Sequence, residues 1–247
     1  MSDVEITTLA ARPALAEQFS RLDGIWPEFV THDRVGDTLF GMVSAEFPEQ
    51  TVVATAGEDL VAVGRSVPFV FPDEHRTELP DGGWDAVLMW AFADRRRGRT
   101  PTVSSALEIL IHPSHAGTGL SHLMLRAMRD AVAALGHATL YAPVRPNGKT
   151  DLAEPMSEYA YRTREDGLPV DPWLRVHVRA GGTIERIAPA SMVVAGSLRQ
   201  WREWTGLPFD TDGEVAVPKA LVPVLVSQAH DRAVYVEPNV WVRHDLA

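Results

Sequence analysis

The sequence contains no cysteine, so it has no disulfide, no thiolate nucleophile and no cysteine ligand for a metal. Lysine is nearly absent, with only Lys149 and Lys219, and the net charge of −10 argues against bulk binding of nucleic acid. No apolar run reaches about 18 residues, the length that a membrane-spanning helix needs. The first residues lack the basic and then apolar pattern of a signal peptide. We therefore expect a cytoplasmic protein, and the preference for arginine over lysine favours a bacterial source.

The pattern of apolar and turn residues over 247 residues predicts an α/β fold. There is no internal repeat, low-complexity segment or clear interdomain linker. Residues 72–101 form a long, charged, turn-rich segment, which we interpret as a binding loop or as a surface excursion. The expected strands are 4–9, 50–56, 60–67, 103–111, 138–144, 183–194, 221–227 and 233–242, and the expected helices are 12–22, 35–47, 120–135, 171–180 and 197–204.

The stretch from Thr102 to Gly136 organises the chain. Its first part, 103–111, is apolar on both faces, which is typical of a strand buried inside a sheet. Its last part, 120–135, has apolar residues at helical spacing, and Gly136 follows the last of them. The turn between them contains Gly117 and Gly119. The sequence therefore predicts a strand, a glycine turn and a helix.

A glycine turn that leads into a helix can hold an anion, because the first N–H groups of a helix lack partners and glycine lets the backbone approach closely. We interpret residues 116–121 as a pyrophosphate cradle to which Thr118 adds a hydroxyl; a plain strand-to-helix turn is the alternative. A P-loop is excluded because the turn has no lysine. A dinucleotide fingerprint is excluded because the third glycine and the later acidic residue are missing.

The run 110–113 followed by 117–121 resembles motif A of the GNAT acyl-CoA N-acyltransferases. In that family the turn reads Arg/Gln-x-x-Gly-x-Gly/Ala and binds the pyrophosphate of coenzyme A. Here Ala116 replaces the usual Arg or Gln, which removes a positive charge, and Ser121 replaces the last Gly or Ala with another small residue. The resemblance implies acetyl-CoA as co-substrate. The cofactor-binding residues that it implies are Ile109, Ile111, Ala116, Gly117, Thr118, Gly119, Leu120, Ser121 and Asn147.

The order of the expected elements is also similar to that of the GNAT fold. The resemblance implies a mixed, mostly antiparallel twisted sheet of about seven strands with flanking helices. It implies a single domain over 1–247, with its core at about 50–190 and an extension at 195–247 that completes the sheet. In this fold the strands 103–111 and 138–144 run parallel and splay apart, so that the pantetheine arm pairs with the edge of the first.

Transfer of an acyl group from a thioester to an amine needs a base, donors for the oxyanion and, in some enzymes, an acid for the thiolate. Glu108 is the only ionisable residue of the central strand, and a carboxylate withdrawn from water accepts a proton more readily. The alternative is a carboxylate paired with an arginine. The resemblance places His177 where many GNAT enzymes have a tyrosine that acts as the general acid. The alternative is that His177 is a packed, hydrogen-bonded histidine. Tyr159 and Tyr161 are the substitutes for that role.

The candidate contacts to the acceptor come from the irregular segments. Trp84 and Asp85 would face the substrate from the segment 72–101, and packing of Trp84 on the sheet is the alternative. Tyr161 would also contact the acceptor. Arg145 would meet a carboxylate of the substrate or a phosphate of CoA, and a solvated loop is the alternative.

The leading hypothesis is an N-acyltransferase that moves an acetyl or other acyl group from acyl-CoA to an amine of a small molecule. The alternatives are an acyl-CoA-binding protein without turnover and a decarboxylase of a malonyl thioester. His112 and His115 flank the glycine turn, but no third ligand lies close in the sequence, so we expect no metal. We expect acyl-CoA and an amine as partners, no nucleic acid and no membrane, and we leave a homodimer open.

Overall fold

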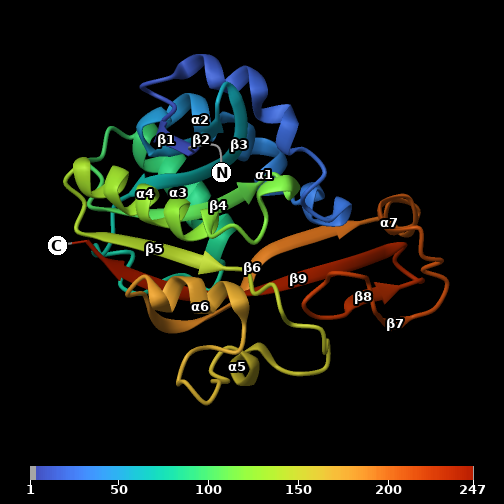
Figure 1. The fold of residues 1–247 in the computed structure, drawn as a ribbon. Helices are drawn as coiled ribbons and strands as arrows, with labels where there is room; N and C mark the ends of the chain where they lie inside the picture. The colour runs from blue at the N-terminus through green and yellow to red at the C-terminus, as the bar shows by residue number, and fades with distance from the viewer. Residues whose placement is uncertain (1–3, 247) are drawn as a thin grey trace.

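The protein folds around one nine-stranded sheet, drawn as arrows in Figure 1. The structure is a computed structural model that describes residues 4–246. The strands are β1 (Val4–Thr8), β2 (Thr51–Ala56), β3 (Asp59–Phe69), β4 (Val103–Ile111), β5 (Thr139–Val144), β6 (Thr183–Gly196), β7 (Gly213–Val215), β8 (Val224–Ser227) and β9 (Arg232–Asp245). Their order is β1-β2-β3-β4-β5-β9-β8-β7, with β6 also paired to β9. Only β4 and β5 are parallel neighbours among these strands, which confirms a mixed, mostly antiparallel sheet.

Helices cover both faces of this sheet. The 3₁₀ helix η1 packs on β3 on one face, and α4 packs on β2, β3 and β4 on the other. No helix within residues 4–246 is long and apolar enough to cross a membrane. The helical segments are η1 (Pro13–Leu22), η2 (Glu28–His32), α1 (Arg34–Leu39), η3 (Phe40–Met42), α2 (Val43–Glu46), η4 (Pro48–Gln50), α3 (Gly83–Arg96), η5 (Pro113–His115), α4 (Leu120–Ala134), α5 (Met156–Tyr159), α6 (Pro172–Arg179) and α7 (Leu198–Thr205).

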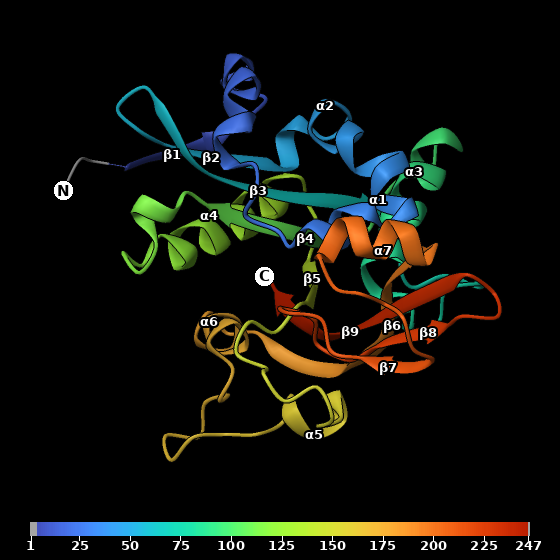
Figure 2. The same ribbon diagram turned by 90° about the vertical axis from the view of Figure 1, so that its right-hand side faces the viewer.

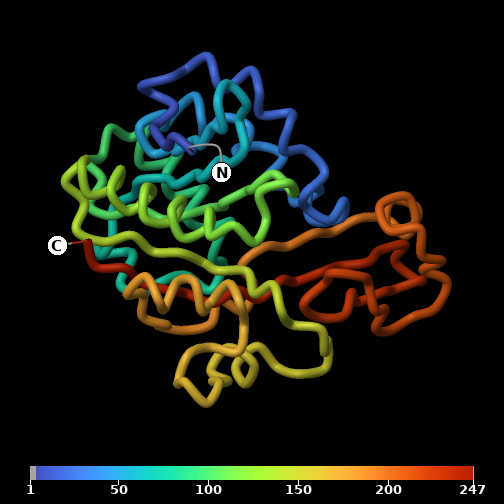
Figure 3. Tube along the Cα trace, in the orientation of Figure 1, coloured from blue at the N-terminus to red at the C-terminus, as the bar shows by residue number. Residues whose placement is uncertain are grey.

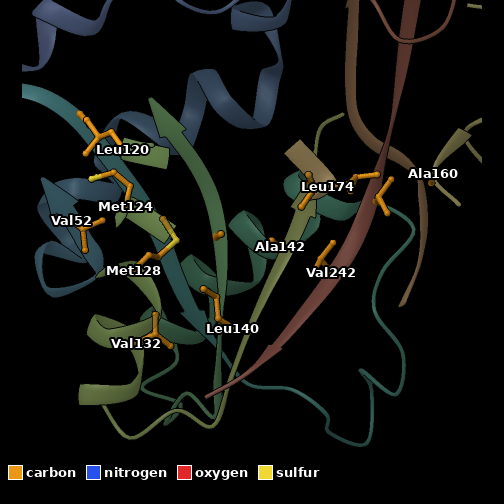
Figure 4. Packing of buried hydrophobic residues seen from close by; sticks show 14 of the residues in the cluster. Val52, Leu120, Met124, Met128, Val132, Leu140, Ala142, Ala160, Leu174 and Val242 are labelled. Carbon is orange, nitrogen blue, oxygen red and sulfur yellow. The ribbon is translucent and has the colours of Figure 1, made fainter. Parts of the chain in front are cut away.

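The central strand, turn and helix form as the sequence predicts. The strand β4 covers 103–111, and α4 begins at Leu120 and is followed by Gly136, whose φ of +83° suits glycine. One stripe of α4 is fully buried on the sheet, and each such side chain contributes about 1.5–3 kcal/mol by leaving water. Figure 4 shows this stripe, Leu120, Met124, Met128 and Val132, against Val52 and Leu140 of the strands.

The strands β4 and β5 pair over a very short length. Only Ser104–Leu140 and Ser105–Tyr141 are in register, and the residues of β4 from 106 to 111 have no partner on β5. A bulge marks the place where the strands part, because Arg65 of β3 opposes Glu108 whereas Ser66 opposes Ala106. In Figure 2 the two halves of the molecule diverge on either side of β4 and β5. The structure therefore contains the splay that the GNAT resemblance implies.

The C-terminal segment completes the sheet through β9. This strand pairs with β6 over most of its length and with β5 near its end. The segment between β6 and β9 contains α7, β7 and β8, and its path is followed most easily in Figure 3. A capping box begins α7, since Ser197 and Gln200 each bond the other's backbone.

Three expectations need correction. Residues 72–101 are not an irregular loop, because 83–96 form α3, with Trp84, Val87, Leu88 and Ala91 buried at i, i+3, i+4 and i+7. The irregular segment after β5 contains the short helix α5. The sheet has nine strands where the resemblance implies about seven; β8 lies within the expected strand 221–227, and β7 was not among the expected strands.

Candidate active site

The turn between β4 and α4 lies beyond the end of β4 that has parted from β5. Gly117 and Gly119 have φ of +74° and +85°, in the left-handed region that favours glycine. The first turn of α4 carries no acidic residue, so its N–H groups and dipole are available to an anion. The hydroxyl of Thr118 donates to the carbonyl of His115 at 2.8 Å, so the additional donor that we expected there is engaged within the turn.

Glu108 is buried and has two partners. Its Oε1 accepts from Nη1 of Arg65, and its Oε2 accepts from Nε1 of Trp26 at 3.0 Å. The Arg65 guanidinium in turn lies 4.6 Å from the ring centre of Phe19 and 5.3 Å from that of Phe40. The contacts are those of the arginine-paired alternative, and they fix the carboxylate at the bulge of β4. Its catalytic role stays a prediction.

Trp84 lies in the first turn of α3 and packs on the sheet. Its backbone N–H donates to Oγ of Ser191 at 2.9 Å, and its indole Nε1 donates to the carbonyl of Leu107 at 3.0 Å. Leu107 is the bulged residue of β4, next to Glu108. Trp84 therefore packs on the sheet, as the alternative interpretation has it. Its hydrogen bond to Leu107 holds the N-terminal end of α3 beside the splay.

Asp85 forms a buried pair of carboxyl groups with Asp33, the N-cap of α1. Asp33 accepts from the N–H of Gly36 at 2.6 Å, and Asp85 accepts from the N–H of Val193 at 3.3 Å. Burial and the neighbouring Asp33 raise the pKa of Asp85 to about 8, and burial also raises the pKa of Asp33. The pair therefore holds a proton near neutral pH.

Arg145 is occupied by an acidic partner on β9. Its Nε donates to Oε2 of Glu237 at 2.9 Å, and its Nη2 donates to the carbonyl of Lys219 at 2.6 Å. Glu237 is fully buried, also accepts from the hydroxyl of Tyr235, and helps to raise the pKa of Asp85. The structure thus places Arg145 and Asp85, two of the expected acceptor contacts, within the electrostatic reach of Glu237.

Asp171 forms hydrogen bonds with two more of the candidate residues, Asn147 and Tyr159. Its Oδ2 accepts from the backbone N–H groups of Asn147 and Gly148 and from the hydroxyl of Tyr159, at 2.7–3.0 Å. Burial and the Asp171 charge raise the pKa of Tyr159 above its ordinary value. Tyr161 lies apart, with 52% of its surface exposed.

His177 lies on the buried face of α6, away from the solvent. Its Nδ1 is 2.9 Å from Nε2 of His244 on β9, and its ring meets Trp173 edge to face. Burial, and then the neighbouring His244, lower the pKa of His177 well below its ordinary value. These contacts match the packed-histidine alternative, and the role of His177 as an acid stays a prediction.

Sequence reasoning missed Arg65, Asp33 and Glu237. Arg65 and Glu237 each lie in a strand among uncharged neighbours, as Glu108 does. A single cation and a single anion on adjacent strands, such as Arg65 and Glu108, indicate an ion pair. Asp33 precedes a helix and reads as an N-cap, which conceals any other role.

No family model matches the sequence. A curated relative, the arginine N-acetyltransferase avaD of Aspergillus versicolor, is 32% identical to it over 98% of this chain and 93% of the relative. The chain belongs to the GNAT family of acyl-CoA N-acyltransferases. This membership confirms the resemblance that was based on motif A.

Two solved structures share the fold of this GNAT protein. The loading GNAT-like domain of CurA from Lyngbya majuscula is 17% identical, with a TM-score of 0.62 over 99% of this chain and 97% of that one. The GNAT-like decarboxylase GphF, solved with isobutyryl-CoA, is 14% identical, with a TM-score of 0.57 over 99% and 100%. At such identities the likeness concerns the fold alone.

This GNAT protein is an N-acyltransferase that uses acyl-CoA as its co-substrate. The comparisons favour neither a CoA-binding protein without turnover nor a decarboxylase. The relative is fungal, so a bacterial source and a cytoplasmic location stay predictions.

The raised pKa of Asp85 predicts a pH-dependent effect of Asp85→Asn. Between the ordinary value of 3.8 and about 8, the folded protein binds a proton at Asp85 that the unfolded chain lacks, so stability falls as pH rises through this interval. The asparagine amide does not titrate, and it keeps an acceptor for the N–H of Val193. The melting temperature of Asp85→Asn minus that of the wild type should therefore be larger at pH 8 than at pH 5. A difference that is equal at both pH values would contradict the assignment.

Proposed function

We propose that this GNAT enzyme transfers an acetyl group from acetyl-CoA to the α-amino group of arginine. The observation that carries the proposal is the similarity, over nearly the full length of both chains, to an arginine N-acetyltransferase. The charges near the splay support a cationic acceptor, because Asp33, Asp85 and Glu237 are buried there and the nearby cation Arg145 is paired to Glu237.

The chemistry of arginine selects the α-amine as the nucleophile. A guanidinium has a pKa above about 12 and stays protonated, so it has no free electron pair for attack. The pKa of an α-amine is several units lower than that of a guanidinium, so the α-amine can lose its proton to a base and then attack. The guanidinium is therefore a handle for recognition, and the α-amine is the reacting group.

Acetyl-CoA would bind from the side of α4. The pyrophosphate would meet the N–H groups of residues 116–121, whose glycines leave the backbone open. The pantetheine arm would pair with the edge of β4 at Ile109 and Ile111, which β5 leaves free. This path brings the thioester to the bulge at Leu107, next to Glu108.

The reaction then needs one attack and one proton transfer. The amine nitrogen attacks the thioester carbonyl, a C–N bond forms, and the C–S bond breaks with its electron pair on sulfur. Backbone N–H groups of the β4 edge would stabilise the oxyanion. Glu108, held in place by Arg65, accepts the proton that the attacking nitrogen loses, directly or through one water. The products are Nα-acetylarginine and CoA.

We assign no side-chain acid to the leaving thiolate. Tyr159 donates its hydroxyl to Asp171, and His177 is buried against His244, so both groups are engaged. A thiol has a pKa of about 8.5, so a thiolate leaves near neutral pH without a dedicated acid.

The direct test is an assay of the purified protein with acetyl-CoA and arginine. We expect one free thiol and one acetylarginine per turnover, with the acetyl group on the α-nitrogen by mass spectrometry. Nα-acetylarginine should accept no second acetyl group, which controls for transfer to the guanidinium. Release of CoA at the rate of the buffer alone, over a range of arginine concentrations, would refute the proposal.

The role of Glu108 is tested by Glu108→Gln, which keeps the shape of the side chain and removes the base. We expect kcat to fall by about 10²-fold or more, with CoA affinity unchanged because the cradle at 116–121 is backbone. The control is Trp26→Phe, which removes the hydrogen bond to Oε2 and leaves the carboxylate and Arg65 in place. A Gln variant with nearly normal kcat would make Glu108 a structural partner of Arg65.

A further inference from the structure

A cavity of about 650 Å³ opens on the side of the sheet that η1 covers. Its walls come mainly from η1, from the segment that contains η3 and α2, from η4 and from β3. Most of the residues that line it are apolar, and the polar ones are Ser44, Glu49 and Arg65. Small-molecule sites in proteins commonly have such a volume, mostly apolar walls and a few polar groups that fix the ligand.

The guanidinium of Arg65 forms the inner wall of this cavity. It lies 4.6 Å from the ring centre of Phe19 and 5.3 Å from that of Phe40, and both residues line the cavity. Its Nε donates to Oγ of Ser44 at 2.8 Å, and its Nη1 donates to Glu108. The third nitrogen, Nη2, has no acceptor within residues 4–246, so the guanidinium keeps N–H donors free for a ligand.

The charge at the rim of the cavity has the opposite sign. Glu49 on η4 is exposed and has no cation within 4.0 Å in the described part of the chain, whereas Glu46, three residues earlier, is paired with Arg95. Among the described residues that line the cavity, Arg65 and Glu49 alone are charged. The site therefore combines a cation at its inner wall, apolar sides and an anion at its rim.

We propose that this cavity binds the acceptor as an extended α-amino acid, with its α-carboxylate on Arg65 and its cationic side-chain end near Glu49, an inference that rests on the proposed function. Arginine has this distribution of charge, because a carboxylate and a guanidinium lie at the two ends of its apolar stem. Hydrogen bonds between a guanidinium and a carboxylate are among the stronger ones, since both partners are charged. The free N–H groups at Nη2 of Arg65 are therefore suited to a second carboxylate beside that of Glu108.

This placement brings the reacting amine to the base. The α-carboxylate and the α-amine share one carbon, so a carboxylate on Arg65 holds the amine beside the other partner of that residue, Glu108. Glu108 is not among the described residues that line the cavity, and Arg65 contacts both. The guanidinium of the acceptor, held at the rim, is kept away from the base.

The acceptor and the acyl donor then approach from opposite faces of the sheet. The cavity lies on the face that η1 covers, whereas the glycine turn leads into α4, which packs on the other face. Figure 2 shows α2 and α4 on the two sides of β3. Two substrates with separate entrances can be bound together, as direct attack of the amine on the thioester requires.

The first test fills the cavity without changing a charge. Ala14 and Ala16 are both exposed on η1, and of the two only Ala16 lines the cavity. We expect Ala16→Trp to raise the Kd of arginine for the enzyme–CoA complex by about 10-fold or more, because the indole takes the space of the ligand. Ala14→Trp is the matched control and should leave the Kd unchanged. Both variants should melt near the wild-type temperature, because both positions are exposed.

The second test pairs each charge of the cavity with one end of the acceptor. Agmatine lacks the α-carboxylate of arginine, and citrulline has a neutral urea in place of the guanidinium. Arg65→Lys should lower kcat/KM for arginine by about 10-fold more than for agmatine, because a single ammonium cannot hold Glu108 and a second carboxylate as a guanidinium does. Any displacement of Glu108 in this variant affects both acceptors equally, so the difference reports the lost carboxylate contact.

Glu49→Gln examines the other end of the acceptor. It should raise KM for arginine and agmatine by about 3-fold, as expected for an exposed ion pair, and should leave KM for citrulline unchanged. Glu17→Gln is an exposed change of the same charge on η1, outside the cavity, and should alter none of these values. Equal losses for arginine and agmatine in Arg65→Lys, or equal effects on arginine and citrulline in Glu49→Gln, would overturn the inference.

The calorimetric measurement separates this inference from the proposed function, because it needs no turnover. Binding of arginine that Ala16→Trp weakens and Ala14→Trp does not, without acetylation, would support the cavity and contradict the proposed reaction. Acetylation of arginine at the wild-type rate and KM in Ala16→Trp would contradict the cavity alone. Absence of both binding and acetylation would overturn both.

Discussion

The parting of β4 from β5 is the constraint on which the rest of the structure depends. Two parallel strands that pair at only two positions leave the edge of β4 from 106 to 111 without a partner on β5. A strand edge without a partner offers its backbone groups to an added strand or an extended ligand, and we infer that this edge receives the pantetheine arm. The bulge at Leu107 opens the strands at the same point where Arg65 fixes Glu108. In the proposed function, this one local irregularity creates both the slot for the thioester and the site of chemistry.

The C-terminal insertion shapes the opposite side of that slot. Its helix α7 packs on η2, and Trp201 of α7 contacts Phe29 of η2, so the segment 26–33 is held from outside the sheet. The segment in turn carries Trp26 to Glu108 and Asp33 to Asp85. An element that lies far from the central strand in the sequence therefore helps to position the residue that bonds Glu108. We infer that this insertion adapts the GNAT fold to its acceptor, whereas the α4 side serves the cofactor.

The sequence allows the cofactor side to be predicted and conceals most of the acceptor side. The strand 103–111, the glycine turn and α4 are contiguous, so their spacing and the positive-φ glycines identify them. The caps of α6 at Asp171 and of α7 at Ser197 are likewise formed by residues that are close in the sequence. The pairs Arg65–Glu108 and Asp33–Asp85 join residues that are distant in the sequence, and only the register of the strands and the packing of α3 bring them together. Helix α3 was not among the expected helices, because the charged and glycine residues on either side of it conceal the helical spacing of its apolar residues.

Hydrogen–deuterium exchange with and without CoA tests the central claim most directly, because the claim concerns backbone N–H groups. CoA should slow exchange in β4 at residues 106–111 and in the turn at 117–121, and should leave the inserted strands β7 and β8 unchanged. Unchanged exchange along 106–111 at saturating CoA would show that the thioester does not enter between β4 and β5. That result would contradict the proposed position of the thioester, on which the account of the active site depends.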